Sequence, residues 1–150
     1  MRRAIQVSVA CYRYLTLIDL DRLTSAIRAL FPQVWAIYLF GSHATGEARS
    51  ESDVDVAVLL PPGESLSAFE RWSLGESLAR ELGCDVDLVD LAAAPTVFQL
   101  QIIERGQRLF CAEPLQCDAF EGRVLSDYAR LNEERAGILE DIIARGRVYE

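Results

Sequence analysis

Val54, Val56, Val58 and Leu60 alternate along the chain as in a β-strand that is buried on one face. Two aspartates, Asp53 and Asp55, stand at the start of this pattern. Side chains two positions apart in a strand project from one face, roughly 7 Å apart. Asp53 and Asp55 would therefore point together, while the alternating valines enter the core. Aspartate is disfavoured in strands, and burying an ionised carboxylate without a partner costs several kcal/mol. The pattern predicts either two carboxylate-bound cations, Mg²⁺ first among them, or two solvated aspartates at a strand mouth.

A Gly-Ser pair follows the apolar run "VWAIYLF" (34–40) and begins the segment that leads to the aspartates. A glycine after a buried strand lets the backbone N–H groups of a short helix approach a phosphate, and a serine hydroxyl adds a donor. Gly41 and Ser42 therefore predict an anion site beside the cation site. The alternative is a simple strand exit with a helix cap.

A third carboxylate is expected from a neighbouring strand, and the stretch "CDVDLVDL" (84–91) supplies the candidates. Asp87 stands between two core residues of that strand and is the favoured third acid. Asp85 shares its face and Asp90 lies near the strand end, so either of them stays open as the third ligand.

The composition excludes several kinds of chemistry. The chain has a net charge of −8 and contains no lysine, which excludes a Walker A lysine, a Schiff base and a lysyl-adenylate. An acidic chain lacks the basic face that tracks nucleic acid, so we expect no stable nucleic-acid binding. His43 is the only histidine, which excludes clustered histidine metal sites. The available reactive groups are carboxylates, hydroxyls and arginines.

The four cysteines are scattered, with no C-x-x-C pair, so we expect reduced thiols rather than a zinc site or a disulfide framework. No apolar run of about 18 residues or more occurs, which excludes a membrane-spanning segment. Residues 1–18 match a signal peptide poorly because polar residues interrupt their apolar part. We therefore expect a cytoplasmic protein.

Hydrophobic periodicity and turn residues predict one mixed α/β domain over residues 1–150, a small sheet flanked by helices, with a long C-terminal helix. The expected helices span Asp19 or Asp21 to about Leu30, a short stretch in 42–47, about 65–82, 95–105, and 118 to about 145. The expected strands span 34–40, 54–60, 84–91 and 107–110, with a further edge strand within 5–11. An apolar stripe on the last helix either packs wholly on its own domain or leaves part of itself for a partner. Its members are Val124, Tyr128, Leu131, Ile138, Leu139 and Ile142.

These residues resemble a known family. The stretch "GSHATGEARSESDVD" is similar to the signature of the polymerase-β-like nucleotidyltransferase superfamily, which is Gly-Ser, ten residues and Asp-x-Asp. "DVDLVDL" looks like the strand of its third acid, and the match covers a core of about 21–112, followed by a helical extension of about 113–150. The whole chain resembles the minimal nucleotidyltransferase (MNT) proteins that pair with HEPN-domain toxins.

The resemblance implies a nucleotidyltransferase fold and a role for each residue. Asp53 and Asp55 would hold two Mg²⁺ ions on the triphosphate, while Gly41 and Ser42 grip the β- and γ-phosphates. Asp87 would hold the catalytic metal and help to remove the acceptor's proton. Arg49 is either a phosphate-neutralising residue or a solvated loop arginine, and His43 is expected to be a surface helix residue.

The implied reaction is transfer of AMP from ATP to a tyrosine hydroxyl of a HEPN toxin, which makes the chain the antitoxin of a toxin-antitoxin pair. Only about 38 residues follow the core, too few for an acceptor-binding domain, so the acceptor is expected to bring its own surface. The alternatives are a small-molecule nucleotidyltransferase that completes its site as a dimer, and an antitoxin that acts by binding alone. Either a homo-oligomer or a hetero-oligomer with the toxin is compatible with the sequence.

Overall fold

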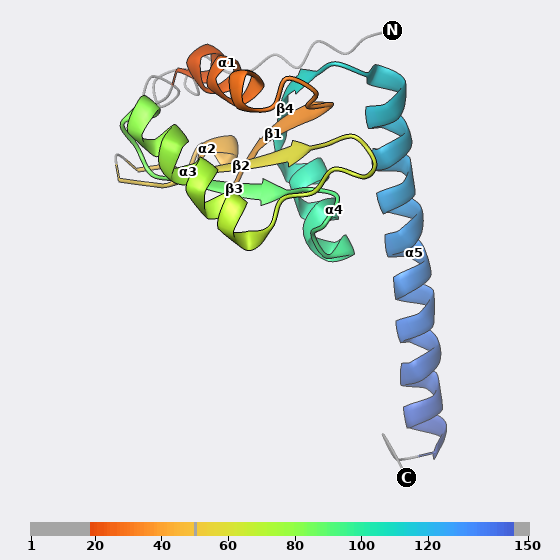
Figure 1. Ribbon diagram of the computed structural model, residues 1–150. Coiled ribbons are helices and arrows are strands. Elements are labelled where there is room, and N and C mark those ends of the chain that lie inside the picture. The colour runs from red at the N-terminus through yellow and green to blue at the C-terminus, as the bar shows by residue number, and fades with distance from the viewer. Residues whose placement is uncertain (1–18, 50, 146–150) are drawn as a thin grey trace, which may run out of the picture.

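The computed structural model describes residues 19–49 and 51–145, and Figure 1 shows a twisted sheet with helices on both faces and one long helix at its side. The elements are α1 (Leu20–Leu30), β1 (Ala36–Phe40), α2 (Ser42–Thr45), β2 (Val54–Leu59), α3 (Ala68–Leu82), β3 (Val86–Asp90), α4 (Thr96–Arg105), β4 (Gln107–Cys111) and α5 (Pro114–Arg145). The strand order is β3-β2-β1-β4. β1 runs antiparallel to β2 and β4, whereas β2 and β3 are parallel.

Local signals in the sequence explain where the helices begin and end. The Asp19 carboxylate accepts hydrogen bonds from the backbone N–H groups of Asp21 and Arg22, which caps α1. Ser67 and Glu70 form a reciprocal capping box at the start of α3. Gly83 ends α3 in the left-handed conformation, as the sequence predicts. The α3 helix thus delivers the chain directly into β3.

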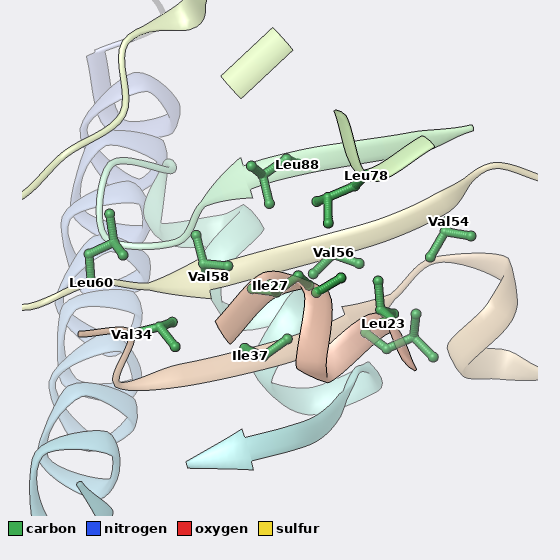
Figure 2. Packing of buried hydrophobic residues seen from close by; sticks show 12 residues of the cluster. Leu23, Ile27, Val34, Ile37, Val54, Val56, Val58, Leu60, Leu78 and Leu88 are labelled. Atoms are coloured by element: carbon green, nitrogen blue, oxygen red, sulfur yellow. The ribbon is translucent and has the colours of Figure 1, made fainter. Parts of the chain in front are cut away.

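The sheet is buried on both faces. Helices α1 and α3 cover one face, where the alternating valines of β2 pack against Leu23, Ile27 and Leu78 (Figure 2). Helices α4 and α5 cover the other face over Ala57, Leu59 and their neighbours. The predicted alternation of β2 is therefore confirmed, and the face that carries Asp55 is apolar further along the strand because α4 and α5 cover it there.

Helix α5 packs on the domain only through its first half. Cys117, Phe120 and Val124 are buried, whereas Ile138 is 59% exposed and Ile143 is 82% exposed. Figure 1 shows the second half of α5 extending past the sheet. The interpretation that the whole apolar stripe packs on its own domain is therefore wrong, because a helix of 32 residues is longer than the sheet it lies against.

The predicted helices and strands over residues 19–145 are present in the structure with small shifts in their bounds. The last helix begins at Pro114 instead of near Asp118, because proline fits the first turn of a helix, where its missing N–H is not needed. The edge strand expected within 5–11 lies outside the described residues. None of the helices in residues 19–49 and 51–145 combines the length and the apolar character that crossing a membrane requires.

Candidate active site

The register of the sheet brings the aspartates of β2 and β3 together. In the sheet, Asp55 of β2 is paired with Phe40 of β1 on one side and with Asp87 of β3 on the other. It therefore lies between the end of β1 and the start of β3. Asp53 stands just before β2, two positions from Asp55 and therefore on the same side. Asp55 is half-buried, while Asp53 and Asp87 are exposed. The structure thus places Asp53, Asp55 and Asp87 at the end of the sheet where β2 and β3 begin, which is called the acidic edge below.

Gly41 lies directly against the Asp55 side chain. Its φ of 67° is in the left-handed region, and a Cβ built there would overlap the Asp55 carboxylate oxygen Oδ2. A glycine is required on both counts. The short helix α2 begins at Ser42, and no side chain caps it. The backbone N–H groups at the first turn of α2 therefore start beside Asp55, where an anion could reach them.

Negative charge accumulates at this edge. The pKa of Asp55 is raised, first by burial and then by the neighbouring carboxylates of Asp87 and Asp53, and His43 opposes the rise. Within residues 19–49 and 51–145, no three His, Cys, Asp or Glu side chains converge closely enough to hold a metal ion as they stand. Mutual repulsion keeps like-charged carboxylates apart when no cation lies between them. Carboxylates are nevertheless the hard oxygen donors that suit Mg²⁺.

The other candidate acids are placed differently. Asp90 is buried on the α3 side of the sheet, where its carboxylate accepts hydrogen bonds from the backbone N–H groups of Leu66 and Ala93. These contacts use Asp90 to fix two loops. The Asp85 carbonyl accepts the Val54 N–H at 2.8 Å, and its exposed side chain lines a hollow of about 500 Å³. Glu51, Ser52, Glu76, Ala79, Arg80, Gly83 and Cys84 complete that lining.

Ser52 connects the Gly-Ser turn to the acids. Its carbonyl oxygen lies 3.1 Å from Nε2 of His43, and its hydroxyl oxygen accepts the backbone N–H of Arg49 at 2.8 Å. His43 lies in a helix as expected, and it is half-buried and ties α2 to the residue before Asp53. The Arg49 side chain is exposed, and its phosphate role stays a prediction.

Phe40 is a site residue that the sequence does not reveal. It precedes Gly41, pairs with Asp55 across the sheet, and meets Phe98 of α4 edge to face at 5.6 Å. This aromatic pair packs against the core on the α4 side of the sheet, the face to which Asp55 belongs. Its only sequence signal is a large apolar residue immediately before the Gly-Ser turn.

The amino-acid sequence is similar to those of known proteins. The family model described as polymerase beta, nucleotidyltransferase matches residues 24–115. The chain is 36% identical over 124 residues to the protein adenylyltransferase MntA of Shewanella oneidensis, covering 83% of this chain and 87% of that protein.

Solved structures resemble the whole described fold. A toxin-antitoxin crystal structure with AMP-PNP contains a chain that is 34% identical, with a TM-score of 0.73, covering 84% of this chain and 99% of that one. A structure of a tri-AMPylated Shewanella oneidensis HEPN toxin in complex with its MNT antitoxin matches at 33% identity and a TM-score of 0.66, covering 83% and 95%.

Proposed function

This chain belongs to the polymerase beta nucleotidyltransferase family, and on that basis we propose that it uses Mg²⁺ to transfer AMP from ATP to a tyrosine hydroxyl of a HEPN-type toxin. Membership of the family makes it a nucleotidyltransferase. The observation that carries the proposal is the position of Asp55, which has the Gly41 turn on one side and Asp87 on the other. The turn proposed to bind phosphate and the carboxylates proposed to bind the cation therefore meet at one residue.

Asp53, Asp55 and Asp87 are the groups that would hold Mg²⁺. The pKa of Asp55 is raised first by burial and then by the nearby carboxylates of Asp87 and Asp53, and a bound cation would relieve both effects. Bound Mg²⁺ would neutralise charge on the triphosphate and lower the pKa of the attacking hydroxyl. Asp53 and Asp87 are both exposed, so their side chains are free of the packing that half-buries Asp55.

Gly41 and Ser42 would bind the β- and γ-phosphates through the start of α2 and the serine hydroxyl. The acceptor oxygen would then form a bond to the α-phosphorus, and the bond from that phosphorus to pyrophosphate would break. Asp87 would take the hydroxyl proton. Arg49 would approach the phosphates only by turning its exposed side chain inward, so we assign it an auxiliary role.

The acceptor is proposed to be a protein. Helix α5 lies at the far end of the sheet from α2, so its long second half does not cover the acids (Figure 1). The related chains in solved structures are antitoxins in complex with toxins, and one of those toxins is tri-AMPylated. By analogy, this chain would modify and neutralise a HEPN toxin, and so act as an antitoxin.

The test is transfer of label from ATP to a purified HEPN-domain protein whose gene neighbours the gene of this chain. With Mg²⁺ present, label in the α-phosphate should appear on the toxin, whereas label in the γ-phosphate should not. Replacing the acceptor tyrosine with phenylalanine should abolish labelling. Label found only on a small hydroxylated compound, and never on protein, would support a small-molecule nucleotidyltransferase instead.

Two variants separate catalysis from binding. Asp53→Asn and Asp55→Asn keep the size of each side chain and remove its charge, so both should lose AMP transfer and toxin neutralisation together. Asp19→Asn is a matched control, because asparagine caps α1 as well as aspartate does. If the two site variants neutralised the toxin at the wild-type level, the chain would act by binding alone.

A further inference from the structure

Two cysteines meet where β4 leads into α5. The Cys111 thiol donates a hydrogen bond to the Cys117 sulfur, with 2.9 Å between the two Sγ atoms. Cys111 is half-buried at the end of β4, whereas Cys117 is fully buried in the first turns of α5. Neither residue belongs to the acidic edge described above. The proposed function therefore leaves this thiol pair without a role.

Backbone contacts hold the two sulfur atoms together. Cys111 pairs with Ala36 in the sheet, and the next residue donates its N–H to the Trp35 carbonyl at 2.8 Å. Cys117 is fixed by its own N–H bond to the Glu113 carbonyl at 2.9 Å. Both ends of the short connection are thus anchored in regular structure. The sulfur atoms must move by less than about 1 Å to reach the length of a disulfide bond.

We propose that Cys111 and Cys117 form an oxidisable dithiol site, which a small disulfide compound converts into an intramolecular bond between β4 and α5. The site differs from a pair of ordinary reduced thiols because its two sulfur atoms already lie 2.9 Å apart, within reach of each other for thiol-disulfide exchange. The bond would tie α5 covalently to the sheet at the point where the helix begins.

The half-buried Cys111 reacts first, because solvent reaches it more easily than the buried Cys117. The Cys111 thiolate attacks one sulfur of the small disulfide, whose S–S bond breaks and releases one small thiol. Cys117 then loses its proton and attacks the Cys111 sulfur, and the second small thiol leaves. In total, two protein thiols are oxidised and one small disulfide is reduced to two thiols. Burial raises the pKa of Cys117, which suits it to the second, local step better than to the first.

The experiment uses the full chain with Cys11→Ser and Cys84→Ser, so that only the two thiols of interest remain. The folded protein is incubated with glutathione disulfide, quenched in acid, alkylated and examined by mass spectrometry. We expect a species lighter than the dithiol by two hydrogen atoms, with a peptide link between Cys111 and Cys117. Its melting temperature should exceed that of the reduced protein, since the bond restricts the unfolded chain.

Two single variants make the assignment specific. Cys117→Ser should stop at a stable mixed disulfide on Cys111, whereas Cys111→Ser should leave the buried Cys117 unmodified while the protein stays folded. If Cys117→Ser does not fold, the Cys111→Ser variant still carries the test, because it changes the half-buried member. A mixed disulfide that persists on Cys111 with Cys117 present, or a link that forms only in denaturant or between chains, would overturn the proposal.

Discussion

The carboxylate of Asp55 lies against the backbone of Gly41, so closely that no side chain fits between them. We expect Gly41→Ala to lower the rate of AMP transfer by about 100-fold or more, since displacement of a catalytic group by about 1 Å has effects of that size. The measurement is the initial rate with labelled ATP. Gly63→Ala is the matched control, because Gly63 also has a positive φ of 87° but has nothing within 4 Å of the added Cβ. Equal losses of activity in the two variants would show that backbone strain, and not the Asp55 contact, is responsible.

Asp55 should also influence stability in a pH-dependent way. Its pKa is raised above 3.8, so the folded state holds this proton more tightly than the unfolded chain. The stabilising contribution is therefore complete below the unfolded pKa and is lost as the pH rises through the folded pKa. At neutral pH without metal, Asp55→Asn removes a partly buried charge and should raise the melting temperature by about 2–4 °C, the shift expected when the free energy of unfolding of a chain of this size rises by about 1 kcal/mol.

Added Mg²⁺ provides the complement to that measurement. It should raise the melting temperature of the wild-type protein by binding only the folded state, and raise that of Asp55→Asn much less. Thermal scans at several pH values, with and without Mg²⁺, check both points. If Asp55→Asn melted below the wild type at neutral pH, the surroundings of Asp55 would stabilise its ionised carboxylate, contrary to the prediction.

His43 should act as a positioning residue through its contact with the Ser52 carbonyl. His43→Ala removes the ring that ties α2 to the residue before Asp53, and we expect kcat to fall by about 10-fold to 100-fold. His43→Gln retains an N–H donor and should recover part of the loss. The measurement is kcat and KM for ATP in steady-state kinetics on both variants. If the loss came only from unfolded protein, His43→Gln would be no more active than His43→Ala.

The two halves of α5 should differ in their effect on folding. Phe120→Ala removes a side chain that is 5% exposed, and we expect it to lower the free energy of unfolding by about 3 kcal/mol. Ile143→Ser changes a side chain that is 82% exposed, and its effect should stay within about 0.5 kcal/mol. Urea unfolding of the isolated chain measures both. A large effect of Ile143→Ser would mean that the second half of α5 packs on the domain in solution.

Much of the architecture follows from local sequence alone. The alternation of apolar residues identifies β2, Asp19 or Asp21 marks the start of α1, and Gly83 identifies the end of α3. These features act over a few residues, so a single sequence reveals them. Asp53, Asp55 and Asp87 also stand out in the sequence alone, because a carboxylate in an otherwise apolar strand is costly without a function.

Only the tertiary structure decided between candidates that look alike in the sequence. Asp87 and Asp90 lie three positions apart in one strand, yet pairing with β2 places Asp87 beside Asp55, while Asp90 turns to the other face and binds two loops. His43 and Ser52 are nine positions apart and meet only in the folded chain. The second half of α5 is exposed because the helix extends past the sheet. Local chemistry determines which residues can act, but register and the finite size of the sheet determine which of them meet.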